Sequence, residues 1–436
     1  MVSRRFERDE GAGVRRFWEI ELEGREIVTR RGKLEGLVDA KRRKLDSPEG
    51  ALEQAELQVE ERTSEGWIEV TAQVQGPARN AELERAIVDD PRDPAPWSVY
   101  ADWLQARGDP FGEPLALSLT NAAEFDPRAL WSTQLRWLGN ALELERLGPL
   151  EHRHGFLVEA RVEWPEILGM NAARRLLAAL LRSPTSQLLR RLTLARPSNN
   201  QLVDALLGDD DSLRLEQLRE LTLGEFEDRC PFAWVRIGDL ARVLLACPTL
   251  ERLRAWGSEI GWTQTVQHGA LERLELVTGG LASEVVEALL RSKLPRLRRL
   301  DLWFGQPGWG ASATIEQLRP LFDPTHLPEL RELGLINAEF TDAIVEALVG
   351  SRRLATLERL DLSRGTLHEP GAAAILTHAA AFRRLRSLDL DANYLSPASS
   401  EALALALPGI VRIGEQVDPT IGRPDGPPGY YAAVGE

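Results

Sequence analysis

Hydrophobic residues recur in one short pattern through the second half of the chain. The pattern is leucine, two variable residues, leucine, one variable residue and an apolar residue, and its eight copies lie between Leu189 and Leu390. Consecutive copies are 21 to 33 residues apart, as measured between their middle leucines, which are Leu192, Leu221, Leu253, Leu274, Leu300, Leu333, Leu360 and Leu388. A period of this size indicates one supersecondary unit per copy.

Each copy predicts a short strand, because its apolar residues alternate, as Leu300 and Leu302 do. Between copies the apolar spacing changes to three and four residues, as in Val285, Val286 and Leu289, which predicts amphipathic helices. A strand followed by a helix, repeated, makes neighbouring strands parallel and places the helices outside them. Because no unit covers its own apolar face, we expect the units to stack into a curved α/β solenoid.

These strand copies resemble the leucine-rich repeat family, and the long period with full helices is similar to its ribonuclease-inhibitor-like branch. The last copy also carries the asparagine of the family, Asn393 in LDLDANYL. The resemblance implies a concave face of parallel strands and a convex face of helices. We assign residues 155–414 to this domain, with the alternating HGFLVEARVEW (154–164) as an atypical first repeat.

Residues 1–72 are predicted to form a small α+β domain. RRFWEIELEG opens a strand, Gly24 turns the chain, Ser47 caps a helix that starts at Pro48, and residues 66–70 (GWIEV) form a last strand. The runs RRFWEIELEGREIVTRRGKLEG and SPEGALEQAELQVEERTSEGWIEV resemble the WGR domain. The naming tripeptide of that family aligns with Arg31-Gly32-Lys33, where only the glycine is kept. In poly(ADP-ribose) polymerases the tryptophan and arginine of the tripeptide help to contact DNA.

A basic stretch in this domain has two interpretations. It is either a solvated edge of a hairpin or a patch that binds phosphates or acidic groups. The second interpretation predicts nucleic-acid binding by Arg30, Arg31, Lys33, Lys41, Arg42, Arg43 and Lys44.

Three further segments complete the predicted domain organisation. Residues 73–79 are a linker by their Gly and Pro content, and residues 122–154 are a helical connector. Residues 80–121 form helices that resemble the bacterial repeat-companion domain, centred on VYADWLQARGDPFGE. Residues 415–436 are rich in Gly and Pro, lack periodicity and are predicted to be a flexible tail.

Composition and charge narrow the function further. The net charge of −14 argues against a general affinity for nucleic-acid phosphates or anionic lipid. Cys230 and Cys247 match neither a disulfide framework nor a zinc spacing, so we expect core thiols in a reducing compartment. Neither a signal peptide nor a membrane span is predicted. We find no phosphate loop, metal cluster or nucleophile motif, and expect no cofactor.

The variable residues of each strand copy point away from the core and form three columns on the concave face. The third column has an apolar middle with two tryptophans, and the first two columns hold arginines beside acids. Tryptophan and arginine are the preferred anchors of binding sites. The alternative is a structural patch covered by loops. The predicted partner-binding residues are Trp256, Val277, Trp303, Ile336, Arg254, Arg273 and Arg299.

Together these observations predict a non-enzymatic scaffold or adaptor of a bacterial cytoplasm. We expect a monomer that binds an unidentified protein partner on its concave face and that does not bind membranes. The alternative is a nucleic-acid-associated regulator that uses the WGR-like domain.

Overall fold

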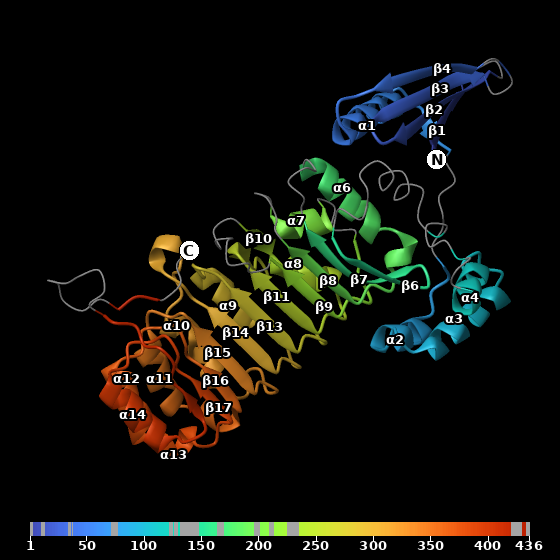
Figure 1. The fold of residues 1–436 in the computed structure, drawn as a ribbon. Coiled ribbons are helices and arrows are strands. Elements are labelled where there is room, and N and C mark those ends of the chain that lie inside the picture. Colours follow the sequence, from blue (N-terminus) through green and yellow to red (C-terminus); the bar gives the residue numbers. More distant parts are fainter. Residues whose placement is uncertain are drawn as a thin grey trace. The chain divides into compact units, whose positions relative to one another are not determined.

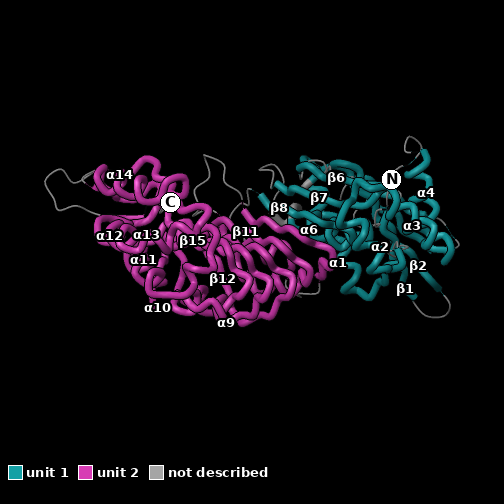
Figure 2. The backbone as a smooth tube through the Cα atoms, turned by 90° about the horizontal axis from the view of Figure 1, so that it is seen from below, with its two compact units in different colours: residues 1–195 teal, residues 196–436 magenta. Residues whose placement is uncertain are grey.

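The computed structural model has a mixed α/β architecture. It describes residues 3–9, 14–33, 36, 38–70, 77–121, 125, 130, 148–163, 170–195, 201–208, 213–224, 235–419 and 430–432. The chain divides into two compact units, Met1–Ala195 and Arg196–Glu436 (Figure 2). Each unit is described by itself below.

The first unit opens with an antiparallel sheet and one helix (Figure 1). In chain order the elements are β1 (Ser3–Asp9), β2 (Arg15–Glu23), β3 (Glu26–Lys33), β4 (Val38–Lys44), α1 (Pro48–Ser64) and β5 (Ile68–Glu69). The strands lie in the order β4-β3-β2-β1-β5, so β4 is an edge strand. As predicted, the Ser47 side chain caps α1 by accepting from the Gly50 N–H at 3.0 Å, and Pro48 follows it.

Alternation along β2 gives this sheet a covered face. Trp18, Ile20 and Leu22 are buried on one face, and α1 lies over that face with its buried Leu52 and Ala55. The salt bridge from Arg4 to Glu56 joins β1 to α1 on the same side. The residues on the opposite face include Glu19 and Glu21.

Three short helices follow, in the order α2 (Ala81–Asp89), α3 (Pro94–Ala106) and α4 (Gly112–Thr120). Their core contains the fully buried Trp97 and Tyr100 of α3. The Tyr100 hydroxyl donates to the Ala78 carbonyl at 2.9 Å and accepts from Gln187 at 3.0 Å. Glu84 is fully buried and held by Arg79 at 2.8 Å, which compensates for the desolvation of its carboxylate.

The first unit ends with a hairpin and a crossover. The elements are β6 (Leu150–Arg153), β7 (Phe156–Glu163), α6 (Met170–Leu181), the 3₁₀ helix η3 (Pro184–Ser186) and β8 (Arg191–Ala195). The strand expected in HGFLVEARVEW is confirmed as β7, and β8 pairs with it in parallel. The prediction of a helical connector was wrong at residues 150–153, because these residues form a strand that pairs antiparallel with β7. Residues 122–124, 126–129 and 131–147 of that connector lie outside the described residues.

The second unit is built on a parallel sheet whose strands lie in the order β9-β11-β13-β14-β15-β16-β17-β18 (Figure 1). A smaller parallel pair joins β10 to β12. The strands are β9 (Glu220–Leu223), β10 (Arg236–Asp239), β11 (Arg252–Trp256), β12 (Ser258–Gly261), β13 (Arg273–Val277), β14 (Arg299–Trp303), β15 (Glu332–Ile336), β16 (Arg359–Asp361), β17 (Ser387–Asp389) and β18 (Val411–Arg412).

Helices connect most of these strands, but residues 257–272, between β11 and β13, contain β12 and no helix. The helices are α7 (Leu202–Leu207), α8 (Leu240–Ala246), α9 (Ser283–Arg291), η5 (Pro307–Trp309), α10 (Ile315–Leu318), η6 (Arg319–Phe322), α11 (Thr341–Val349), η7 (Arg353–Thr356), α12 (Glu369–Thr377), α13 (Ala379–Phe382) and α14 (Pro397–Ala406). The predicted helix around Val285, Val286 and Leu289 is therefore confirmed as α9.

The predicted leucine register is confirmed. Leu274 pairs with Leu300, Leu300 with Leu333, and Leu333 with Leu360, and all four are buried. Because the side-chain period of a strand is two, this register gives every strand the same buried face. The alternate residues form the opposite face, which we call the open face.

The turns after three successive strands share a left-handed residue. Asn337, Arg364 and Ala392 have φ of 56°, 61° and 53°. Asn393 follows the last of these and is fully buried. Its Nδ2 donates to the Leu362 carbonyl at 2.9 Å, and its Oδ1 accepts from the Leu367 N–H at 2.9 Å. The asparagine therefore satisfies backbone groups of the preceding repeat.

The described residues of the predicted flexible tail contact the rest of the second unit. The Val417 N–H donates to the Asn393 carbonyl at 2.7 Å. The Tyr430 ring stacks on His368, with centroids 4.5 Å apart, and the Tyr394 hydroxyl donates to the Tyr431 carbonyl at 2.9 Å. The expectation of flexibility was therefore wrong for these residues, because aromatic contacts and backbone hydrogen bonds hold them. Residues 420–429 and 433–436 lie outside the described residues.

Candidate functional site

The open face carries a row of charged residues at the start of the strands. In register, this row reads Glu220, Arg252, Arg273, Arg299, Glu332 and Arg359. Neighbouring strands are about 4.8 Å apart, so each side chain can reach the next. Three arginines therefore occupy consecutive positions at the centre of the row, which we call the arginine row: Arg252, Arg273 and Arg299.

The two outer members of the arginine row have acidic partners. Arg252 lies 3.2 Å from Glu220, and Arg299 lies 2.6 Å from Asp301 and 3.5 Å from Glu332. The central Arg273 is exposed, and no hydrogen bond or ion pair joins its side chain to any residue that the structure describes. The centre of the row is therefore a guanidinium with a like charge on each side.

In the second row of the open face, acidic residues lie on the strands nearer the C-terminus of the chain. Arg254 pairs with Glu275 at 3.2 Å, and the following strands carry Asp301, Gly334 and Asp361. Burial raises the pKa of Asp301 above its usual range although Arg299 opposes the shift. Burial also raises the pKa of Asp361. Ionisation of these carboxylates is therefore unfavourable unless neighbouring groups stabilise the negative charge.

Two shallow grooves run along these rows. The first, of about 240 Å³, is lined by the arginine row together with Arg254 and Glu275. The second, of about 180 Å³, continues past Asp301 and Glu332 to Asp389. Both volumes are below the roughly 300–1,000 Å³ that is usual for small-molecule sites. The open face therefore fits side chains of a larger partner better than an enclosed ligand.

The third row differs from its prediction. Trp256 and Trp303 are partly exposed, as expected, but Val277 and Ile336 are buried at 0% and 5% exposure. Val277 pairs in register with Trp256 of the neighbouring strand, whose indole is the larger side chain. Val277 and Ile336 therefore are not surface anchors.

Arginines lie over both partly exposed indoles. The Arg254 guanidinium carbon is 4.9 Å from the Trp256 ring centroid, and that of Arg364 is 5.7 Å from the Trp303 ring centroid. Such stacking holds a guanidinium in one orientation and is favourable at exposed sites. Of the predicted partner-binding residues, the structure brings Trp256, Arg254, Arg273 and Arg299 together on adjacent strands, with Trp303 at the end of β14.

The basic stretch of the first unit is divided between two faces of its sheet. Register pairs put Arg31 and Lys33 on the face that α1 covers, together with Lys41 and Arg43 of β4. The opposite face holds the remaining cations. There Arg30 lies 2.8 Å from Glu21, and Arg42 and Lys44 lie 3.4 and 3.9 Å from Glu26.

Three other features considered from the sequence are metal binding, the two cysteines and membrane insertion. Among the described residues no group of three or more His, Cys, Asp and Glu side chains is arranged to hold a metal ion. Cys247 is fully buried, and burial raises the pKa of its thiol to about 12, which agrees with a core thiol. Cys230 lies outside the described residues. None of the described helices has the length and apolar character needed to cross a membrane.

Comparison with known proteins gives information about the fold alone. No family model and no curated protein matches the sequence. Among solved structures, the chain is similar to a Bacteroides fragilis protein that was crystallised as a structural genomics target, with a TM-score of 0.52 and 21% sequence identity. The match covers 96% of this chain and 97% of that protein. At this identity, the likeness supports a shared mixed α/β fold and no shared activity.

Proposed function

We propose that this protein is a non-enzymatic scaffold or adaptor and that residues 155–414 are a leucine-rich-repeat solenoid. The in-register buried leucines, the helices between most successive strands and the backbone contacts of Asn393 support the repeat assignment. In this proposal the open face is the concave surface, and a protein partner docks on it. No catalytic step or cofactor is required.

The observation that carries the proposal is the central Arg273. An exposed arginine between two other arginines, with no acidic partner among the described residues, is electrostatically unfavourable in the free protein. A carboxylate from a partner would remove that repulsion and form a charge-assisted, bidentate contact. We therefore propose that the partner presents an acidic segment to the arginine row.

The tryptophans at the ends of β11 and β14 would supply the apolar part of the interface. Trp256 and Trp303 each combine a large partly exposed ring with a stacked arginine. Rings of this kind, next to arginines, are frequent among the few residues that dominate binding energy. An acidic segment with neighbouring aromatic or aliphatic side chains would therefore match both chemistries.

The proposal is tested by capturing the partner from the native cell with tagged full-length protein, followed by mass spectrometry. We expect Arg273→Glu and Trp303→Ala each to lose a protein that the wild type retains, with an unchanged circular dichroism spectrum. The matched control is Arg291→Glu, which reverses an exposed arginine of α9 outside the open face. Equal capture by Arg273→Glu, Trp303→Ala and the control would refute docking on the open face.

A second candidate function is nucleic-acid-associated regulation by the first unit. It is favoured by β4, where every residue is exposed and Lys41, Arg42, Arg43 and Lys44 are consecutive. Cations on an edge strand also prevent strand addition by another chain, which is a structural reason for the same residues. A mobility shift with full-length protein separates the two, since phosphate binding weakens steeply with salt and would be lost in Arg42→Gln/Arg43→Gln.

A further inference from the structure

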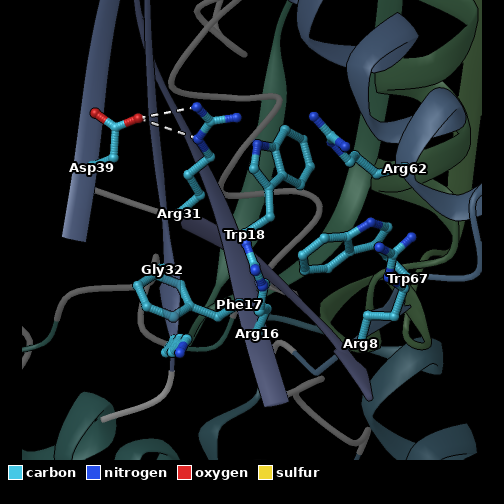
Figure 3. A pocket seen from close by; sticks show the side chains of 10 residues that line it. Arg8, Arg16, Phe17, Trp18, Arg31, Gly32, Asp39, Arg62 and Trp67 are labelled. Carbon is cyan, nitrogen blue, oxygen red and sulfur yellow. Dashed lines mark hydrogen bonds and ion pairs between the residues drawn. The ribbon is translucent and has the colours of Figure 1, made fainter. Parts of the chain in front are cut away.

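The first unit contains a basic pocket of about 700 Å³ (Figure 3). Its floor includes a row of three cations on neighbouring strands, because Arg8 pairs in register with Arg16 and Arg16 with Lys33. Opposite residues of antiparallel strands have Cα atoms about 4.5–5.5 Å apart, so the three residues lie side by side on the sheet. The next row contributes Trp18 and Arg31.

The end of α1 explains why this pocket exists. Alternation along β2 places Arg16 on the same face as Trp18, Ile20 and Leu22, which α1 covers. The helix ends at Ser64, and its last turn adds Arg62 to the pocket. Trp67, three residues after Ser64, lines the same pocket. Cations from three strands and one helix therefore meet beyond the part of the sheet that the helix fills.

The charge of the pocket is strongly unbalanced. Its lining contains five cations and one carboxylate, that of Asp39. Asp39 is already bonded to Arg31 at 3.2 Å (Figure 3). Arg62 is held by Glu65 at 2.7 Å, at the edge of the pocket. For Lys33 the structure describes no hydrogen bond or ion pair with any of the described residues. Among the described lining residues, cations therefore outnumber carboxylates five to one.

Tryptophans hold two of the guanidinium groups in place. The Arg62 carbon lies 5.8 Å from the Trp18 ring centroid and 5.9 Å from that of Trp67, and the Arg8 carbon lies 5.0 Å from Trp67. Trp18 and Trp67 are themselves buried, at 3% and 8% exposure. Stacking against fixed rings lowers the entropy that these arginines lose when they bind a ligand.

We propose that this pocket binds a small polyphosphate compound, of the class of nucleoside di- and triphosphates. Arginines and a lysine side by side match the oxygens of consecutive phosphate groups. A pocket of about 700 Å³ is of the size usual for such molecules, whereas a single phosphate ion fills little of it. The indole faces are already stacked with arginines, so binding is selective for the phosphates rather than for the base.

Isothermal titration of the full-length protein tests this site. We expect ATP and inorganic triphosphate to bind with affinities within about tenfold of one another, orthophosphate to bind more weakly and adenosine not at all. The Arg16→Gln/Lys33→Gln variant should lose at least about tenfold in affinity for triphosphate, since each change removes a charge-assisted contact. The matched control, Arg85→Gln/Arg92→Gln, removes two exposed charges of the first unit that do not line the pocket and should change affinity less than about twofold.

Three results would overturn the assignment. These are absence of triphosphate binding, equal weakening in the control variant, and duplex DNA binding through Arg16 and Lys33 without any binding of free triphosphate. The single variant Lys33→Gln controls for misfolding. The Lys33 side chain has no partner among the described residues, so the substitution should not affect stability. Its unfolding curve should match that of the wild type while its affinity for triphosphate falls.

Discussion

Replacing Arg273 by Gln should stabilise the free protein, although it removes the residue that we propose to bind the partner. Like charges directly opposite on neighbouring strands are unfavourable by about 0.2–1 kcal/mol per pair. Arg273 has two such neighbours, Arg252 and Arg299. Both are partly neutralised by acids at 3.2 Å and 2.6 Å, so we take the lower half of the range for each. The expected gain in the free energy of unfolding is about 0.4–1.2 kcal/mol.

Salt provides an internal check on this number. The Debye length falls from about 10 Å at 0.1 M salt to about 3 Å at 1 M, which is shorter than the strand spacing of about 4.8 Å. The gain should therefore be present in urea unfolding curves at 20 mM NaCl and nearly absent at 1 M NaCl.

Arg299→Gln is the contrasting variant. Arg299 lies 2.6 Å from Asp301, whose side chain is buried, and removal of one partner leaves that carboxylate without its charged donor. We expect a loss of about 1–3 kcal/mol in the free energy of unfolding. If Arg273→Gln also destabilises the protein, or if its gain persists at 1 M NaCl, then Arg273 has a structural role and is not a residue kept for binding.

Two further predictions concern buried polar groups of the second unit. Arg353 is fully buried and donates to the carbonyls of Leu321 at 2.7 Å and Asp323 at 2.8 Å, and also to those of Leu327 and His326. Arg353→Met should therefore lower the free energy of unfolding by about 3 kcal/mol or more, measured by urea denaturation, whereas Arg352→Met at the exposed neighbouring position should change it by less than about 0.5 kcal/mol. A small effect at Arg353 would mean that water replaces its donors. His268 is buried and neutral, since its Nδ1 accepts from the Leu271 N–H at 3.1 Å and its Nε2 lies 3.0 Å from the Cys247 carbonyl. Burial lowers its pKa below the ordinary value of 6.5, so the unfolded chain takes up the proton first. The stabilisation is complete above pH 6.5 and is lost as the pH falls from 6.5 toward the lower folded-state pKa, with a slope of at most about 1.4 kcal/mol per pH unit for this residue. Urea midpoints between pH 7.5 and 5.5 should show this loss, and its slope should be smaller in His268→Gln; an unchanged slope would assign the loss to other histidines.

Local spacing was sufficient to predict the repeated part of the fold. Leu274, Leu300, Leu333 and Leu360 align because the side-chain period of a strand is two and a buried face tolerates no slip of register. The same alternation placed Arg252, Arg273 and Arg299 in one row, so the arginine row follows directly from the sequence once the strands are known to be parallel neighbours.

Features that depend on neighbours from other elements could not be predicted in this way. Val277 and Ile336 occupy outward positions of their strands but are buried, because exposure depends on the size of side chains on adjacent strands. The residues near Tyr430 were predicted to be a flexible tail because they lack periodicity. In the structure, the ring of Tyr430 contacts His368 and Tyr394, which are distant in the sequence.

The pocket of the first unit shows most clearly what only the tertiary structure decided. Sequence reasoning selected a continuous basic stretch that included Arg31 and Lys33 and missed Arg8, Arg16 and Arg62. Strand pairing then separated that stretch into two faces and joined one part of it to cations from β1, β2 and α1. The sequence by itself determined which residues alternate within one strand or helix, since that depends on backbone periodicity. Which charges meet was decided by pairing between distant segments, because electrostatic repulsion depends on distance in space and not on separation along the chain.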